Sequence, residues 1–176
     1  MAIDLSDDRK LIAAAQANAA AFGFVFARYY GPIFRYAVLR TGDPADAEDL
    51  AMDVFTEALA ALPRFRWEDR PLLAWLFSIA RHRSVSRRRK ASGRAPSAAL
   101  DPPATHNGLH EASAEARRLL GKLDGATAEA LVLRFVVDCS FEEIAALQGI
   151  ALSAAKMRVY RAVAKARRVM GVDDEG

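Results

Sequence analysis

The stretch from Ser140 to Met170 most constrains the fold of this chain, because it marks where two successive helices begin, turn and end. Ser140 and Glu143 have the spacing of a capping box, in which each side chain accepts a backbone N–H at a helix start. Gly149 supplies the residue with positive φ that ends a helix and turns the chain. Ser153 follows at a position suited to cap a second helix. The sequence therefore predicts two helices joined by a tight turn.

The second of these helices has an apolar side and a basic side. At about 100° per residue its apolar residues share one arc that faces the core. These residues are Ala155, Val159, Ala162, Val163, Ala166 and Met170. Six basic residues and no acidic one lie between Ser153 and Met170, so the remaining surface attracts phosphate. The alternative is an ordinary helical hairpin with a solvated basic face.

A helix-turn-helix places the start of its second helix against base edges in the major groove, while flanking cations contact phosphates. By this geometry we expect one set of side chains at the bases and another at the DNA backbone. The first set is Lys156, Met157 and Tyr160, and the second is Arg158, Arg161 and Lys165.

Composition and charge limit the other possibilities. A chain of 176 residues with 52% hydrophobic residues forms one domain or two small ones. A single cysteine, Cys139, excludes an internal disulfide and fits a reducing compartment. The acidic start and the lack of a long apolar run predict neither a secretory signal nor a membrane span, so we expect a cytoplasmic protein.

The first half of the chain is predicted to be helical throughout. A helix starting near Ser6 to Asp8 precedes an aromatic run from Phe22 to Ala37, in which Gly31 and Pro32 are expected to kink or break the helix. Thr41 to Pro44 then combines a helix stop with a helix start.

The helix from Pro44 to about Leu62 carries a row of acidic residues. Six acidic residues and no basic one lie between Asp43 and Glu57. The row can serve solubility alone, or it can be a docking face for a basic or polar partner. Both readings remain open at the level of sequence pattern.

A loop rich in aromatic and basic residues, Phe65 to Pro71, follows this acidic helix. Exposed aromatic side chains beside arginines suit stacking on unpaired bases. The next helix, Leu72 to Lys90, is predicted to bury Leu72, Trp75, Leu76, Ile79 and Ala80. Its outward residues are Ser78, Arg81, His82, Val85, Arg88 and Arg89. His82 has no second ligand at suitable spacing, so no metal site is expected, and no cofactor motif occurs.

Residues 91–112 lose periodicity and gain Pro, Gly, Ser and Asn, which predicts a flexible linker. Helical pattern returns at Ala114, and apolar residues up to Val136 are expected to support the helix-turn-helix. They are Leu119, Leu120, Leu123, Leu131, Val132, Phe135 and Val136. The prediction is an all-α fold of two small helical domains, 1–90 and 113–176, joined by the linker.

The order of these parts resembles that of bacterial RNA polymerase sigma factors of the extracytoplasmic-function type, which contain only sigma regions 2 and 4. The resemblance covers most of the chain. Its motifs are Tyr29–Pro32, Gly42–Leu50, Asp53–Phe55, Trp75–Arg81, Phe141–Ala145, Gly149–Ile150 and Lys156–Arg158.

The resemblance implies a partner for each charged surface. The acidic helix would dock on the beta-prime clamp helices of core RNA polymerase through Asp46, Glu48, Asp49 and Asp53. The loop and the following helix would melt the minus-ten promoter element and capture a flipped base. Their residues would be Phe65, Arg66, Trp67, Ser78, Arg81, His82, Val85, Arg88 and Arg89. The helix-turn-helix would read the minus-thirty-five element through Ser153, Lys156, Met157, Arg158, Tyr160, Arg161 and Lys165. The family also suggests an anti-sigma factor as a partner.

The chain departs from the family pattern at several positions. Trp67 follows Phe65 and Arg66 where a glycine is usual, and His82 replaces a common asparagine. Met52 replaces a common glutamine, and Ser153 to Ala155 replaces the more usual Gly-Thr-Val. These departures are expected to change which promoter is read.

Two other classes of function compete with this interpretation. A helix-turn-helix regulator that binds duplex DNA without polymerase explains Ser140 to Met170 but gives the acidic helix no role. An enzyme is not indicated, because the chain has no Gly-rich phosphate loop, metal-ligand cluster or Cys/His pair at a suitable spacing.

Overall fold

The structure is a computed structural model that describes residues 7–68, 70–92 and 109–172. All regular secondary structure in these residues is helical. The first part contains α1 (Asp8–Ala17), η1 (Ala19–Ala21), α2 (Phe22–Thr41), α3 (Pro44–Ala61), η2 (Leu62–Arg64) and α4 (Leu72–Ser92). The second part contains α5 (Leu109–Gly121), α6 (Gly125–Leu131), η3 (Val132–Val136), α7 (Phe141–Gln148) and α8 (Leu152–Met170).

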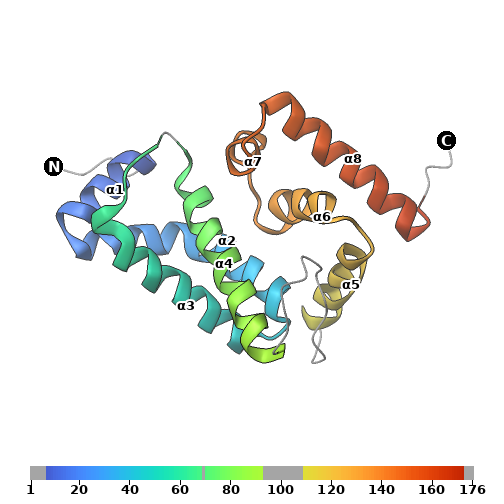
Figure 1. The fold of residues 1–176 in the computed structure, drawn as a ribbon, viewed down its shortest axis with the longest axis horizontal. Helices are drawn as coiled ribbons and strands as arrows, with labels where there is room; N and C mark the ends of the chain where they lie inside the picture. Colours follow the sequence, from blue (N-terminus) through green and yellow to red (C-terminus); the bar gives the residue numbers. More distant parts are fainter. Residues whose placement is uncertain (1–6, 69, 93–108, 173–176) are drawn as a thin grey trace.

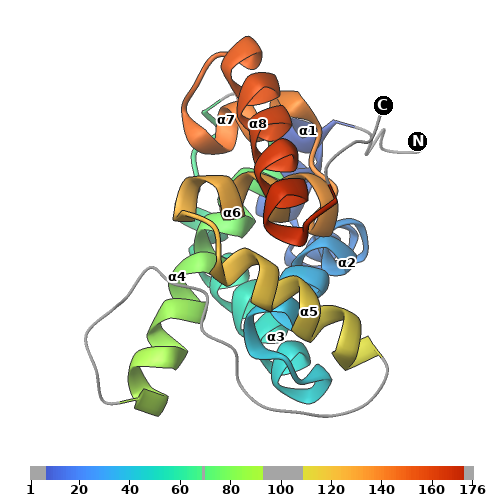
Figure 2. The same cartoon turned by 90° about the vertical axis from the view of Figure 1, so that its right-hand side faces the viewer.

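The helices form two groups that pack against each other. Helices α1 to α4 make one bundle, and α5 to α8 lie along one side of it (Figure 1). The view turned by 90° shows α5 crossing the bundle beside α2 and α3 (Figure 2). A single cluster of buried apolar side chains runs through both groups, from Leu11 in α1 to Ala166 in α8. This arrangement confirms the expected all-α fold with two helical domains.

Local sequence signals set several helix ends as expected. Gly42 ends α2 with a φ of 79°, and the Asp43 side chain accepts the Asp46 N–H at the start of α3. The capping box of Ser140 and Glu143 is present at α7, which ends at Gly149 with a φ of 62°. Each cap satisfies backbone groups that a helix end leaves without a partner.

Helix α2 is not broken at Gly31 and Pro32, so of the two outcomes expected from the sequence, a kink or a break, the break is wrong. Pro32 lies inside a helix that continues to Thr41. A proline within a helix costs about 3 kcal/mol because it removes a hydrogen bond and crowds the preceding turn. The buried stripe of α2, which includes Val25, Tyr29 and Ile33, packs tightly enough to offset that cost.

The start of α8 also differs from the expectation that Ser153 caps it. The helix begins at Leu152, and the N-cap residue Ala151 makes no side-chain hydrogen bond. Burial of Ala155, Val159, Ala162 and Ala166 therefore stabilises this helix more than capping does. Met170, which was expected in the core, is 54% exposed because an apolar arc is buried only where another helix covers it.

Phe135 is the second apolar residue whose expected burial is wrong. It is 64% exposed and lies in η3, a π-helical segment. A π-helix bonds residue i to i+5, so the side chains move off the 3.6-residue pattern that predicted a core position.

The expected linker overlaps the ends of two helices. Helix α4 continues to Ser92, and α5 begins at Leu109 rather than at Ala114. Residues 93–108 lie outside the described residues. The flexibility of the segment 91–112 stays a prediction.

Candidate DNA and polymerase interfaces

The acidic row of α3 divides into an exposed part and a paired part. Asp46, Glu48 and Asp49 are exposed on the first half of the helix. Asp53 is half-buried and accepts from the Arg87 guanidinium at 2.7 Å, and the Glu57 carboxylate pairs with Arg83. The acids therefore do not form one uniform face, because the second half of the row joins α3 to α4.

Two apolar side chains lie on the solvent side of the same helix. Met52 is 50% exposed and Leu59 is 41% exposed. The outer surface of α3 thus combines carboxylates with apolar area, a composition suited to a protein partner better than to a nucleic acid.

The loop after α3 packs its aromatic side chains more deeply than the sequence predicted. Phe65 and Trp67 are both half-buried, and the ring centroids of Phe65 and Trp75 are 4.3 Å apart. Arg66 is exposed beside them. The sequence predicted freely exposed aromatic side chains in this loop. Both rings are instead half-buried, so only their outer edges can stack on a base.

Helix α1 holds both ends of this loop, which sequence reasoning missed. Gln16 Nε2 donates to the carbonyl oxygens of Leu62 at 3.0 Å and Phe65 at 2.8 Å. The other end is fixed by Asp8, whose Oδ2 accepts the backbone N–H of Leu72 at 2.8 Å. No local pattern could reveal these contacts, because their partners lie at least 46 residues apart in the sequence.

The Asp8 carboxylate is itself held in place. Its Oδ1 accepts from Arg28 NH1 at 3.2 Å and from the hydroxyl of Tyr29. Burial, followed by the hydrogen bond to Asp8, raises the pKa of Tyr29 well above its usual range. The tyrosine therefore remains a donor to Asp8 at ordinary pH.

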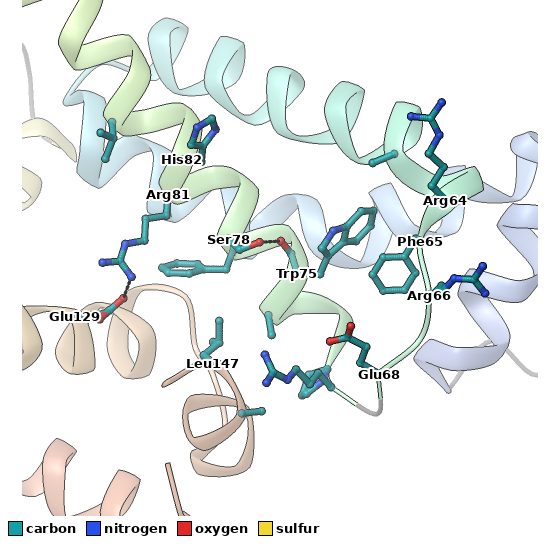
Figure 3. A pocket seen from close by; sticks show the side chains of 17 residues that line it. Arg64, Phe65, Arg66, Glu68, Trp75, Ser78, Arg81, His82, Glu129 and Leu147 are labelled. Atoms are coloured by element: carbon teal, nitrogen blue, oxygen red, sulfur yellow. Dashed lines mark hydrogen bonds and ion pairs between the residues drawn. The ribbon is translucent and has the colours of Figure 1, made fainter. Parts of the chain in front are cut away.

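A cavity of about 890 Å³ lies between the loop and the outward face of α4. It brings together four of the expected minus-ten residues of α4, namely Ser78, Arg81, His82 and Val85, with Phe65 and Arg66 of the loop. Figure 3 shows Trp75 and Ser78 on α4 with Phe65 beside them. Trp67 does not line this cavity, and the side chains of Arg88 and Arg89 lie outside those that the structure describes.

The second group of helices covers part of this cavity. Glu129 of α6 and Leu147 of α7 reach in from the side opposite α4 (Figure 3). Arg81 NH1 and Glu129 Oε1 are 3.1 Å apart. The Glu129 carboxylate therefore occupies a place beside Arg81 where a phosphate could bind.

Arg35 of α2 makes a further link between the two groups of helices. Its guanidinium donates to the carbonyl oxygens of Val136 at 2.7 Å and Val137 at 3.2 Å.

Arg117 of α5 is the most deeply buried charge between the groups. It is 4% exposed, and its NH1 lies 1.8 Å from the position that a Cβ on Gly42 would take. Among the described residues, its Nε and NH1 have no hydrogen-bond partner. Burial lowers the pKa of Arg117. Gly42 is thus required twice, for its positive φ and for the space that the guanidinium fills.

The expected minus-thirty-five residues lie on α8, and most of them are exposed. Ser153, Lys156, Met157, Tyr160, Arg161 and Lys165 all have exposed side chains. Met157 and Tyr160 are 49% and 60% exposed, which leaves apolar area available for thymine methyl groups.

Two cations on α8 have partners within the protein. Arg158 is half-buried, and its NH1 donates to Gln148 Oε1 of α7 at 2.8 Å. Lys165 Nζ lies 2.5 Å from Asp124 Oδ2. The hydrogen bond from Lys165, with further hydrogen bonds from Thr127, holds the pKa of Asp124 well below its usual range. Arg158 is therefore oriented by α7, and the expected DNA-binding residue Lys165 is engaged by Asp124 within the protein.

The lone cysteine lies in the core. Cys139 is fully buried, and burial raises the pKa of its thiol to about 12. Within the described ranges, no group of three His, Cys, Asp or Glu side chains is placed to hold a metal ion. In the same ranges, none of the helices is both long enough and apolar enough to cross a membrane.

Comparison with known protein families finds two matches in order along the chain. The family described as Sigma-70 region 2 matches residues 25–94, and the family described as Sigma-70, region 4 matches residues 113–165. Together the two matches span most of the chain.

Individual relatives are similar over nearly the whole chain. The RNA polymerase sigma factor CnrH of Cupriavidus metallidurans is 34% identical, with 96% of each protein covered. The ECF RNA polymerase sigma factor BldN of Streptomyces coelicolor is 32% identical over 93% of this chain, and the chain spans 66% of that protein's length.

Two solved structures share the fold. The structure of CnrH in complex with the cytosolic domain of CnrY has a TM-score of 0.71 and 30% identity, covering 95% of this chain and 99% of that one. The sigma factor RpoE in complex with the anti-sigma factor NepR from Bartonella quintana has a TM-score of 0.60 and 26% identity. That match covers 87% of this chain and 98% of the RpoE chain.

Proposed function

This chain belongs to the bacterial RNA polymerase sigma factors of the extracytoplasmic-function type, and we propose that it binds core RNA polymerase and directs it to specific promoters. The observation that carries this function is the ordered pair of Sigma-70 region 2 and region 4 matches on one chain. A regulator that acts through a helix-turn-helix alone would have no need of the first match.

Polymerase docking is assigned to the outer surface of α3. The exposed Asp46, Glu48 and Asp49 present negative charge to the beta-prime clamp helices, and Met52 adds apolar area. Asp53 contributes less to the partner, because its carboxylate is engaged by Arg87. Complementary charge of this kind steers association and fixes orientation more than it raises affinity.

Minus-ten recognition is assigned to the cavity beside the loop. An unpaired base in the cavity can stack against the edge of Phe65, while Arg66, Ser78, Arg81, His82 and Val85 surround it. Trp67 lies outside the cavity and would contact only DNA that extends beyond it. Arg88 and Arg89 continue the basic surface in sequence. Unstacking a base costs a few kcal/mol, which stacking and hydrogen bonds in such a pocket can offset.

Minus-thirty-five recognition is assigned to α8 as a helix in the major groove. Lys156, Met157 and Tyr160 would face bases, and Ser153, Arg158, Arg161 and Lys165 would fix the helix on the DNA backbone. The exposure of this surface supports that role, as does the hydrogen bond that Arg158 donates to Gln148 Oε1, which orients the guanidinium.

The proposed domain limits follow from these assignments. Residues 1–90 would bind polymerase and the minus-ten element, residues 91–112 would connect the two domains, and residues 113–176 would bind the minus-thirty-five element. RNA synthesis belongs to the polymerase, so the chain itself supplies no catalytic group. The protein would work in the cytoplasm, where its polymerase and promoters are.

An anti-sigma factor is a further proposed partner. RpoE of Bartonella quintana, which shares the fold, is bound to the anti-sigma factor NepR. A protein that covers the outer surface of α3 or the two DNA surfaces would block initiation by this chain.

Run-off transcription tests the function directly. A genomic fragment library is transcribed by purified core RNA polymerase with and without the protein. New start sites that share two upstream elements are expected only when the protein is present. No added transcript, together with tight duplex binding by the protein alone, would favour the regulator.

A double substitution tests the docking surface. Glu48→Arg with Asp49→Arg should remove co-purification with core polymerase, because both exposed acids become like-charged with a basic partner. The matched control is Glu115→Arg, which adds the same kind of charge on exposed α5. Equal co-purification of the double variant and the control would refute the docking assignment.

A further inference from the structure

Helix α1 lies before the Sigma-70 region 2 match, which begins at residue 25, and has no role in the functions assigned above. Two of its polar side chains, Asp8 and Gln16, contact the boundaries of the minus-ten loop. Asp8 and Gln16 stand at the beginning and near the end of α1, eight residues and therefore about 12 Å apart along the helix axis. From this placement we propose that α1 holds both ends of the base-capturing loop in position, with Gln16 and Asp8 as positioning residues. The inference rests on the minus-ten role proposed above.

Gln16 fixes the first end of the loop. One amide nitrogen donates to two carbonyl oxygens, those of Leu62 and Phe65. These carbonyls flank the point where η2 ends and the chain becomes extended at Phe65, which has a ψ of 130°. The direction in which the loop leaves α3, and with it the position of the Phe65 ring, depends on this one side chain.

Asp8 fixes the second end of the loop. Its carboxylate accepts the first N–H of α4, at Leu72. A carboxylate at this position also interacts favourably with the positive end of the helix. Arg28 and Tyr29 hold the carboxylate from α2, so the start of α4 is tied to two other helices.

The two anchors have a consequence for base capture. Phe65 must remain against Trp75 while the loop between them receives a base. If the loop ends were free, the loop could shift to accommodate a poorly fitting base, and the difference in binding free energy between one base and another would become smaller. When the loop ends are fixed, the binding free energy depends on how well each base fits the cavity. That fit discriminates one base from another.

A substitution at Gln16 separates this role from general stabilisation. Gln16 is exposed, so its replacement leaves the core intact. Gln16→Glu keeps the size and shape of the side chain but replaces the donor with an acceptor that faces two carbonyl oxygens. Gln16→Lys retains a donor and serves as the rescue variant. Ala13→Glu, on an exposed position of the same helix, controls for added charge.

The first measurement is amide hydrogen exchange of the free full-length protein, followed over residues 65–71. Gln16→Glu should exchange faster than wild type in this loop alone, while Gln16→Lys and Ala13→Glu should match wild type. Unchanged exchange in Gln16→Glu would overturn the proposal, whether or not the protein initiates transcription.

The second measurement uses core polymerase and a promoter recovered from the run-off library, with each of the four bases at the captured position. Discrimination among the bases should fall by about three- to tenfold in Gln16→Glu, as the loss of two hydrogen bonds would produce. A merely structural role would lower transcription from all four templates equally, and that result would overturn the proposal. Absence of transcription with the wild-type protein would instead refute the proposed function.

Discussion

The two surfaces that we propose to bind DNA, on α4 and on α8, are both rich in arginine and lysine but use these residues differently. On α4, Arg83 pairs with Glu57 and Arg87 with Asp53, so the cations join α4 to α3. Arg81 pairs with Glu129 of the other helical group. Arg83 and Arg87 thus form ion pairs that stabilise the fold, and Glu129 covers Arg81.

The surface on α8 is open by comparison. Lys156 and Arg161 are exposed, and Met157 and Tyr160 beside them are exposed as well. Several α8 side chains also contact the rest of the protein: Arg158 binds Gln148, Lys165 binds Asp124, and Lys156 and Tyr160 lie beside the ring of Phe141. A count of basic residues therefore overstates the positive charge that α4 offers to a ligand. The same count is closer to the charge that α8 offers.

The largest contrast is expected between the aromatic residues of the two surfaces. Trp75→Ala removes a half-buried ring that packs on Phe65, and should lower the free energy of unfolding by about 2 kcal/mol or more. Tyr160→Ala, at a position 60% exposed, should change it by less than about 0.5 kcal/mol. Urea unfolding followed by circular dichroism measures both. Equal losses would mean that the α8 surface is also part of the packed structure.

The next contrast separates cations that bind DNA from cations that hold the fold. Lys156→Ala with Arg161→Ala should weaken promoter complexes about tenfold and reduce the slope of log affinity against log salt by about one, because Arg161 is assigned to a phosphate and Lys156 to a base. Arg83→Ala with Arg87→Ala should leave that slope unchanged but lower stability by about 1 kcal/mol, since their ion pairs are half-exposed. Salt titration of polymerase–promoter complexes checks the first pair of changes, and urea unfolding checks the second. A lower salt slope for the Arg83 and Arg87 double variant would contradict this contrast, because it would mean that these two cations also contact phosphates.

A smaller effect is expected where α6 covers the α4 surface. Glu129→Gln removes the carboxylate from Arg81 and should tighten binding of a short single-stranded oligonucleotide by about two- to threefold, as loss of a surface ion pair allows. Fluorescence anisotropy of a labelled oligonucleotide measures the change. Glu115→Gln, which also removes one exposed acid, controls for net charge. If both variants gained the same affinity, covering by Glu129 would have no specific effect.

The smallest effect concerns the pH dependence of the pair at the edge of α8. The pKa of Asp124 is held below its ordinary value of 3.8 in the folded protein, first by Lys165 and then by Thr127. Stability from a depressed carboxyl pKa is present above the unfolded value and is lost as the pH falls through the folded one. Asp124→Asn should therefore lower the urea midpoint slightly at pH 7, and the difference from wild type should shrink below about pH 4. An equal difference at pH 7 and pH 3 would show that the charge of Asp124 plays no part.

Local patterns in the sequence predicted most of the helices and the helix-turn-helix. Gly42, Asp43, the capping box at Ser140 and Gly149 each act within a few residues, so their effect can be read from the chain itself. The buried side of α3 followed the helical period for the same reason. Where the period changes, as in η3 at Phe135, the same reasoning was wrong.

The sequence by itself therefore determined the all-α fold, the order of the two helical groups and the family to which they belong. Only the tertiary structure decided which charges remain available. Asp53 and Arg87, Arg81 and Glu129, and Gln16 and Phe65 are each 34 or more residues apart in the chain, and no local pattern relates them. Side chains that distant meet only when helices pack, and packing rather than spacing fixes which polar groups are left to face a partner.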